Sequence, residues 1–227
     1  MSATHPTSST AKPSPSLPST PDGYAEPYEF SYPTVALIVG SSLLGIGTAV
    51  AVVALLTAVH GPETFTFFEV SVDGETTTYA MDLTAIGIPF LIALIATTVV
   101  HEGLHGLAFR YYGHDVTFGF VPSMGAFYAA VFGEFQRRDD MLRVGSAPLV
   151  VISAVCVPLL FVPIPGVAIT AGFVLVLNTA GAIGDLYALW RLRGLPEGTL
   201  LYDIDIRRSY VYEPTATGTG NDDRNPR

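Results

Sequence analysis

At the centre of this chain lies the stretch Val99-Val100-His101-Glu102-Gly103-Leu104-His105-Gly106-Leu107. Residues four apart on an α-helix lie one turn above each other on the same face, so His101 and His105 can bind one metal ion together. Glu102 directly follows the first histidine, where helical zinc hydrolases carry the carboxylate that deprotonates water. The spacing therefore predicts a helical metal site with Glu102 as the catalytic base.

The surroundings of this stretch are apolar. Residues 85–108 are otherwise apolar or small and form a segment long enough to cross a bilayer. Ionisable side chains are costly in such a segment and indicate a functional site. The structural alternative is a pair of histidines hydrogen-bonded between helices, with Glu102 at the boundary with the lipid head groups. That alternative explains neither the four-residue spacing nor the glutamate.

The composition predicts an integral membrane protein. Of the 227 residues, 49% are hydrophobic and 14% are charged, and the mean hydropathy is +0.44. Soluble domains carry about 25% charged residues. The apolar composition makes the lipid bilayer the expected partner, and the net charge of −9 argues against nucleic-acid binding. The single cysteine, Cys156, cannot form an internal disulfide and is expected to be a small buried hydrophobe.

The hydropathy pattern predicts an all-α polytopic membrane protein with about four transmembrane helices. The apolar segments that predict them are residues 35–59, 85–112, 147–163 and 167–189. Between the first two, residues 63–81 are β-prone around an Asp73-Gly74 turn and predict an acidic hairpin. Residues 115–131 predict a β-hairpin-like loop between the second and third helices, too apolar for a free solvent loop.

The two ends of the chain differ from this central region. Residues 1–30 are rich in Pro, Ser and Thr and are expected to be disordered. Residues 194–227 form a polar tail in which residues 201–206 alternate briefly, as one strand would. Most arginines flank one side of the predicted spans, which places both termini in the cytoplasm by the positive-inside rule.

A third metal ligand is needed because a catalytic zinc site takes three protein ligands and leaves one position open. Asp185 is the only other carboxylate within the predicted spans. His105 lies five residues before Arg110, about 7.5 Å along a helix, and Asp185 lies six before Arg191, about 9 Å. The two groups therefore reach a similar depth near the cytoplasmic face.

Alternatives to this ligand set remain open. Asp185 could be a lone polar group paired with Asn178 or a threonine, and Glu134 or an acid of the tail would then complete the site. Asn178 lies two helical turns before Asp185 on the same face and is expected to bind substrate or a water molecule beside the metal. Helix packing is the other explanation for Asn178.

The pattern of these residues also resembles that of a known group of proteins. An HExxH motif inside a membrane helix is followed two helices later by Asn178 and Asp185, with an apolar hairpin between them. Over roughly residues 85–192 this resembles the site-2 protease clan of intramembrane zinc metalloproteases, and more narrowly a family of small membrane proteins classed as putative zincin peptidases. The resemblance implies Zn²⁺ on His101, His105 and Asp185, with Glu102 activating water. It also implies that residues 31–193 form a transmembrane metalloprotease domain that cleaves membrane segments of other proteins.

Two other functions use the same residues. One is a catalytically inactive protein of the same fold that binds membrane peptides, and the joint presence of Glu102 and both histidines argues against it. The other is a metal or ion carrier, against which four helices without an internal repeat argue. The hairpin around residues 118–131 is expected to hold an unwound substrate strand by edge pairing, or else to be an ordinary packed loop.

Overall fold

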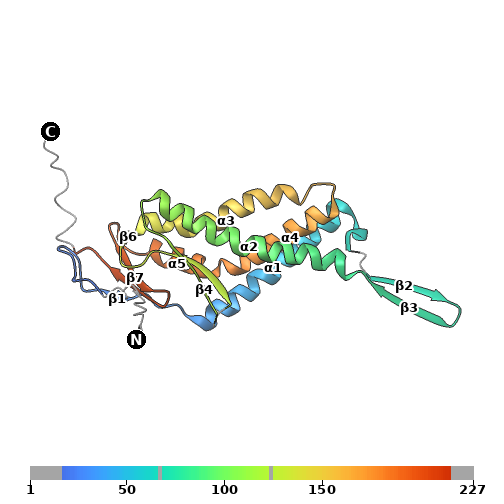
Figure 1. Ribbon diagram of the computed structural model, residues 1–227, viewed down its shortest axis with the longest axis horizontal. Helices are drawn as coiled ribbons and strands as arrows, with labels where there is room; N and C mark the ends of the chain where they lie inside the picture. The colour runs from blue at the N-terminus through green and yellow to red at the C-terminus, as the bar shows by residue number, and fades with distance from the viewer. Residues whose placement is uncertain (1–16, 66–67, 123–124, 216–227) are drawn as a thin grey trace, which may run out of the picture.

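The computed structural model describes residues 17–65, 68–122 and 125–215, in which α-helices form an elongated bundle with small sheets at its ends (Figure 1). The helices are α1 (Thr34–His60), α2 (Leu83–Tyr111), α3 (Arg138–Leu159), α4 (Pro165–Gly181) and α5 (Ile183–Arg193). A 3-10 turn, Pro62–Phe65, follows α1.

Three antiparallel sheets accompany the helices in the described residues. The largest has the strand order β1-β8-β7-β6 and lies at one end of the bundle (Figure 1). Its strands are β1 (Tyr28–Glu29), β6 (Phe135–Arg137), β7 (Leu200–Asp205) and β8 (Arg208–Tyr212). The hairpin of β2 (Phe68–Asp73) and β3 (Thr76–Met81) projects from the opposite end, and the hairpin of β4 (Thr117–Val121) and β5 (Ala126–Ala130) packs against α2.

The prediction of an all-α protein is wrong, because the structure is 57% helical and 19% strand and is therefore a mixed α/β protein. The sequence indicated β7 but not β1, β6 or β8, and β1 and β8 join the two predicted tails: Tyr28 pairs with Val211, and Tyr24 bridges to Pro214. The expected disorder of residues 1–30 does not hold from residue 17 onward, while residues 1–16 lie outside the described part. The partner strands β1 and β8 lie about 180 residues apart in the sequence, so no local pattern reveals their pairing.

The prediction of a fourth, continuous transmembrane helix is also wrong. Among the described residues, three helices are long and apolar enough to cross a membrane, namely α1, α2 and α3. The predicted fourth span is divided into α4 and α5, which are bent by 47° at Ala182. Gly181 and Gly184 flank the break, and glycine is a poor helix former. Together, α4 and α5 return the chain to the end where α1 begins (Figure 1).

The third helix begins earlier than its apolar segment suggested. It starts at Arg138, nine residues before the predicted Ala147. Asp139 and Asp140 lie in its first turn, where the helix dipole favours negative charge. Hydropathy alone located the part of this helix that is apolar and missed its charged beginning.

Small residues allow α1 to pack closely against α4. Ser41 Oγ donates a hydrogen bond to the carbonyl oxygen of Ala180 at 2.9 Å, and a Cβ added at Gly45 would lie 3.2 Å from the Ala180 Cβ. Such contacts between small side chains are typical of helices in lipid. The main buried cluster joins α1, α3 and α4, and it includes Cys156 as a buried hydrophobe (Val52, Leu56, Ile152, Cys156, Leu160, Ala168, Ala171, Leu175).

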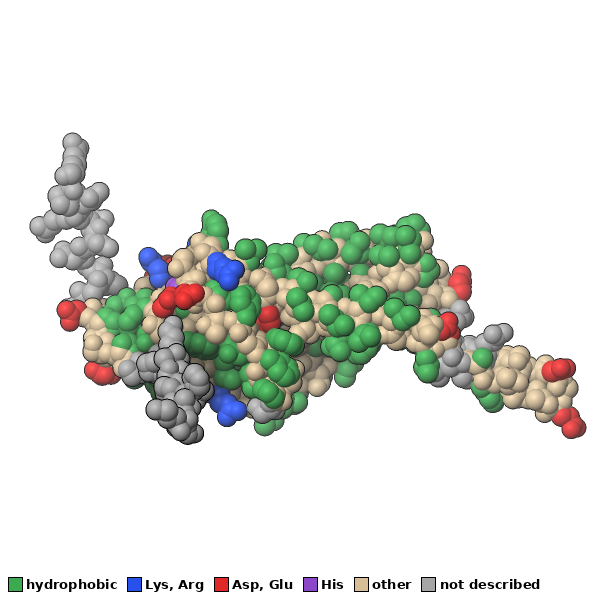
Figure 2. All heavy atoms as spheres, viewed as in Figure 1, with side chains coloured by type: hydrophobic (Ala, Val, Ile, Leu, Met, Phe, Trp, Pro, Cys, Tyr) green, Lys and Arg blue, Asp and Glu red, His purple; other side chains and the backbone are tan. Residues whose placement is uncertain are grey.

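The outer surface of the bundle is apolar. On the face shown in Figure 2, hydrophobic side chains cover the helices, arginines lie near the sheet end, and acidic side chains mark the tip of the β2–β3 hairpin. On α1, Val35 is 77% exposed and Leu43 is 67% exposed. A helix that is hydrophobic all round is either buried or in contact with lipid. The structure is therefore compatible with a membrane protein.

Candidate metal centre

Helix α2 positions both histidines. The Asp82 side chain caps its first turn by accepting hydrogen bonds from the backbone N–H groups of Thr84 and Ala85, at 3.0 and 3.2 Å. The helix then continues without a break to Tyr111, so that His101 and His105 lie on one face in its latter half. Their ring centroids are 4.9 Å apart. The spacing in the sequence thus becomes a pair of neighbouring rings.

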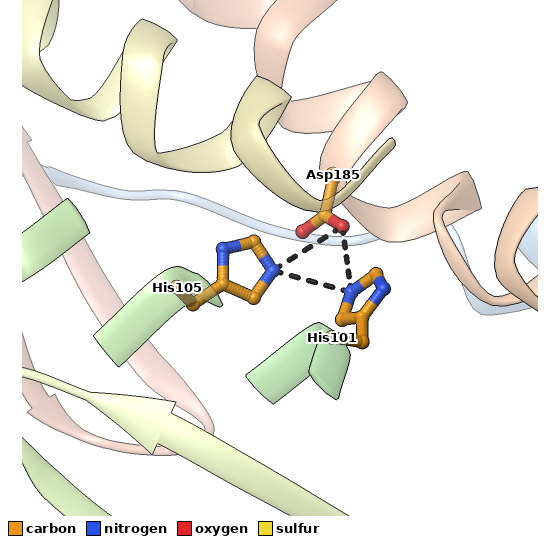
Figure 3. Close-up of side chains that lie close together, drawn as sticks. All are labelled: His101, His105 and Asp185. Carbon is orange, nitrogen blue, oxygen red and sulfur yellow. Dashed lines mark hydrogen bonds and ion pairs between the residues drawn. The ribbon is translucent and has the colours of Figure 1, made fainter. Parts of the chain in front are cut away.

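Three side-chain atoms converge at this point (Figure 3). Oδ2 of Asp185 lies 3.2 Å from Nε2 of His101 and 3.4 Å from Nε2 of His105, and the two nitrogens are 3.2 Å apart. In the described residues, these side chains form a cluster of His, Cys, Asp or Glu groups able to share a metal ion. They are the three residues that the sequence indicated as ligands.

The break between α4 and α5 gives Asp185 its place. Because α5 begins at Ile183, Asp185 lies in the first turn of a helix. The partial positive charge of a helix N-terminus stabilises a carboxylate there. A continuous helix over residues 167–189 would have placed Asp185 in a helix interior. The sequence predicted the residue and missed the break, of which Gly181 and Gly184 were the visible signal.

The outer ring nitrogens fix the orientation of both histidines. Nδ1 of His101 lies 3.0 Å from Oδ1 of Asn178, and Nδ1 of His105 lies 3.1 Å from the carbonyl oxygen of Val144. Both partners are acceptors, so each Nδ1 carries the ring proton and donates it. Each Nε2 is then left with a lone pair directed toward Asp185. This is the tautomer that a metal ligand requires.

The donor set and its spacing fit zinc. Tetrahedral zinc with bonds of about 2.0–2.1 Å has ligand atoms about 3.3 Å apart. The three distances of 3.2, 3.4 and 3.2 Å agree with that value. Two imidazole nitrogens and one carboxylate oxygen are also a donor set of catalytic zinc sites, which leave a fourth position for water or substrate.

Glu102 lies beside the cluster, between α2 and the β4–β5 hairpin. Its carboxylate interacts electrostatically with His101, His105 and Asp185. Its Oε2 also accepts a hydrogen bond from the backbone N–H of Ala129 at 2.8 Å. Sequence reasoning missed both Ala129 and Val144, because each contributes only backbone atoms, which carry no signature of residue type.

Two other residues from the sequence analysis lie near this region. Asn178 is fully buried and contacts His101, and its Nδ2 has no hydrogen-bond partner among the described residues. Its contact with a substrate stays a prediction. Glu134, the alternative third ligand, pairs with Nδ1 of His114 at 3.2 Å and is not part of the cluster.

Part of the chain is similar to a known protein family. Residues 94–200 match the sequence profile of a family described as "Putative zincin peptidase". No curated protein and no solved structure matches the chain. The matched segment contains both histidines, Glu102 and Asp185. The match supports the narrower of the two resemblances, without confirming the site-2 protease clan, and this similarity to the zincin peptidases indicates a zinc metallopeptidase.

Proposed function

We propose that this protein is an intramembrane zinc metalloprotease that hydrolyses peptide bonds in or near transmembrane segments of other proteins. The observation that carries the proposal is that Asp185 of α5 converges with His101 and His105 of α2, a helix apolar and long enough to cross a membrane. Ionisable groups are costly at such a position, and their presence therefore indicates a functional site. The similarity to zincin peptidases supports a peptidase rather than an ion carrier.

The residues at this site fall into three groups by their proposed role. His101, His105 and Asp185 would hold a zinc ion, which when bound would supply Lewis-acid chemistry for a carbonyl group and a water molecule. The Glu102 carboxylate accepts a proton from the attacking water and donates it to the leaving amine. Asn178 and the Val144 carbonyl hold the two imidazole rings in the required tautomer.

The substrate segment must be extended at the cleavage site. A helix engages its carbonyl groups in internal hydrogen bonds, so a membrane segment has to unwind locally before its peptide bond is accessible. The β4–β5 hairpin packs against α2 beside Glu102, where it would hold the unwound segment as an added strand.

The proposed orientation is that of a multi-pass protein of the cell membrane with both termini in the cytoplasm. The pairing of β1 with β8 supports termini on one side, because it brings both ends of the described chain into one sheet. Arg110, Arg137 and Arg191 lie at helix ends or strands on that side, and the β2–β3 hairpin at the opposite end contains neither Lys nor Arg. In this orientation the cluster of His101, His105 and Asp185 would lie near the cytoplasmic face.

The test is cleavage by the purified, zinc-loaded protein in liposomes that contain a panel of transmembrane peptides, with new termini identified by mass spectrometry. Glu102→Gln should retain zinc and lower the rate of cleavage by about 10²–10⁴-fold, since it loses proton transfer. Cleavage at an unchanged rate by this variant would contradict the role of Glu102. Peptide binding without turnover by the wild-type protein would favour the inactive binding protein.

A further inference from the structure

The β4–β5 hairpin contacts one stripe of α2 that begins at the proposed base. The stripe consists of Glu102, Gly106 and Arg110, which are four residues apart and therefore share a face. Glu102 accepts the hydrogen bond from Ala129, a Cβ added at Gly106 would collide with the Phe118 ring, and the Arg110 guanidinium lies 5.8 Å from that ring's centre. Side chains and backbone of both strands thus hold the hairpin beside the metal cluster.

The geometry of the hairpin shows which edge of β5 faces α2. Pairs in an antiparallel ladder alternate between residues that exchange hydrogen bonds and residues whose N–H and C=O groups point outward. The Ala129 N–H is directed to Glu102, so Phe118 and Ala129 form a pair that does not exchange hydrogen bonds. Phe120 and Phe127 lie two residues further along the ladder and are therefore a pair of the same type. Phe127 and Ala129 therefore form an outer edge of β5. In the described residues, no strand pairs with this edge.

The Glu102 carboxylate occupies an acceptor position on that edge. Its Oε2 lies 2.8 Å from the Ala129 nitrogen, the distance at which a carbonyl oxygen of an added strand would be bound. A single N–H group cannot make a full hydrogen bond to both acceptors at once. An incoming strand and Glu102 must therefore compete for the same donor.

We propose that the hydrogen bond from the Ala129 N–H restrains Glu102 until a substrate strand docks on β5. On docking, this N–H donates to a substrate carbonyl oxygen instead, and the Glu102 carboxylate is freed. The proposal rests on the proposed function, which it extends to the control of the same site. Ala129 is a positioning residue and acts only through its backbone. The base is thereby released for proton transfer at the moment a peptide bond is held beside the metal cluster.

Two inactive variants of the full-length, zinc-loaded protein test this competition. Glu102→Gln keeps a side-chain oxygen that can accept from Ala129, whereas Glu102→Ala has none. The probe is a dye-labelled apolar peptide of about 20 residues, built from Leu and Ala with a central Gly-Pro, whose binding is followed by fluorescence anisotropy. The Glu102→Ala variant should bind it about tenfold more tightly, the effect of gaining one hydrogen bond.

Removal of the donor shows whether this difference arises at Ala129. Ala129→Pro deletes an outward N–H without loss of a ladder hydrogen bond, and it should make the affinities of the two Glu102 variants equal. If the proline prevents folding, a backbone ester at position 129, made with lactic acid, removes the same N–H and keeps the methyl group. Phe127→Pro is the matched control, because it removes a neighbouring N–H that does not contact Glu102 and should weaken both variants equally.

Equal binding by the Gln and Ala variants, or a difference that persists without the Ala129 N–H, would overturn the proposal. Binding by none of the variants would overturn docking on β5 as well. Neither inactive variant needs to cleave the probe. If the wild-type protein fails to cleave any peptide while the affinity difference holds, the proteolysis proposal fails and the competition at Ala129 stands.

Discussion

At the scale of single residues, the sequence predicted what depends on side-chain type. An apolar chain has few ionisable groups in its helices, so His101, Glu102, His105 and Asp185 could be singled out and their common depth compared. The sequence could not predict the backbone groups that bind these side chains, namely the Val144 carbonyl at His105 and the Ala129 N–H at Glu102. Every residue supplies a backbone carbonyl and every residue except proline an N–H, so only the fold determines which one lies at the site.

Asp185→Asn should lower the affinity for zinc by about 10–100-fold, because an amide oxygen is neutral and a weaker ligand than a carboxylate. The measurement is a competition between the purified protein and a zinc chelator dye. Glu134→Gln is the matched control: it neutralises an acid that pairs with His114 outside the cluster, and zinc affinity should not change. Unchanged affinity in Asp185→Asn would contradict the ligand assignment.

At the scale of elements, local signals predicted local structure. The Asp73-Gly74 turn and the apolar residues 115–131 predicted hairpins, which the structure contains as β2–β3 and β4–β5. The helix break at Ala182 was not predicted, because an apolar segment with two glycines is also compatible with a straight helix. The pairing of β1 with β8 was not predicted either, because β1 becomes stable only by pairing with a strand from the other end of the chain.

Gly106→Ala should displace the Phe118 ring from α2 and loosen the β4–β5 hairpin, because the added methyl group collides with that ring. Hydrogen exchange of the β4 and β5 amides, followed by mass spectrometry, should become faster. Gly103→Ala is the control on the same helix, where a Cβ meets nothing within 4 Å. It should leave hairpin exchange unchanged and stabilise the helix by up to about 1 kcal/mol. Equal exchange in both variants would contradict this docking.

Asp203 on β7 makes the stability of the sheet depend on pH. Burial raises the pKa of its carboxyl group, although hydrogen bonds from Ser209 and Gln136 oppose the shift. A raised pKa means that the folded protein binds the proton more tightly than the unfolded chain. Stability is therefore lost as the pH rises from about 3.9, the value for a free aspartate, through the higher pKa of the folded state.

Asp203→Asn should remove this loss, so the variant should gain thermal stability over the wild type as the pH rises and show no gain near pH 4. Asp205→Asn is a control for which the expected change in stability has the opposite sign. Despite its desolvation, hydrogen bonds from Arg207 and Arg208 lower the pKa of Asp205, so that variant should be less stable at neutral pH and equal to the wild type in acid. Thermal unfolding across this pH range checks both, and a pH-independent difference for Asp203→Asn would contradict the assigned cause.

At the scale of the whole molecule, the small sheets outside the helices lie at two opposite ends of the bundle. The sheet that joins β1, β8, β7 and β6 lies at one end, and the β2–β3 hairpin lies at the other (Figure 1). A reporter fused after Arg227 should therefore read as cytoplasmic, and one inserted at Gly74 should read as external. Gly74 suits an insertion because it lies in an exposed turn with nothing within 4 Å of an added Cβ. The reverse pattern would contradict the orientation and the side on which the site opens.

The most direct test of the central claim is the metal content of the purified full-length protein, determined by elemental mass spectrometry. The convergence of His101, His105 and Asp185 predicts about one zinc ion per chain. His101→Ala combined with His105→Ala should reduce the zinc content to near zero, since one carboxylate alone cannot hold the ion. Full zinc occupancy in this double variant would contradict the account.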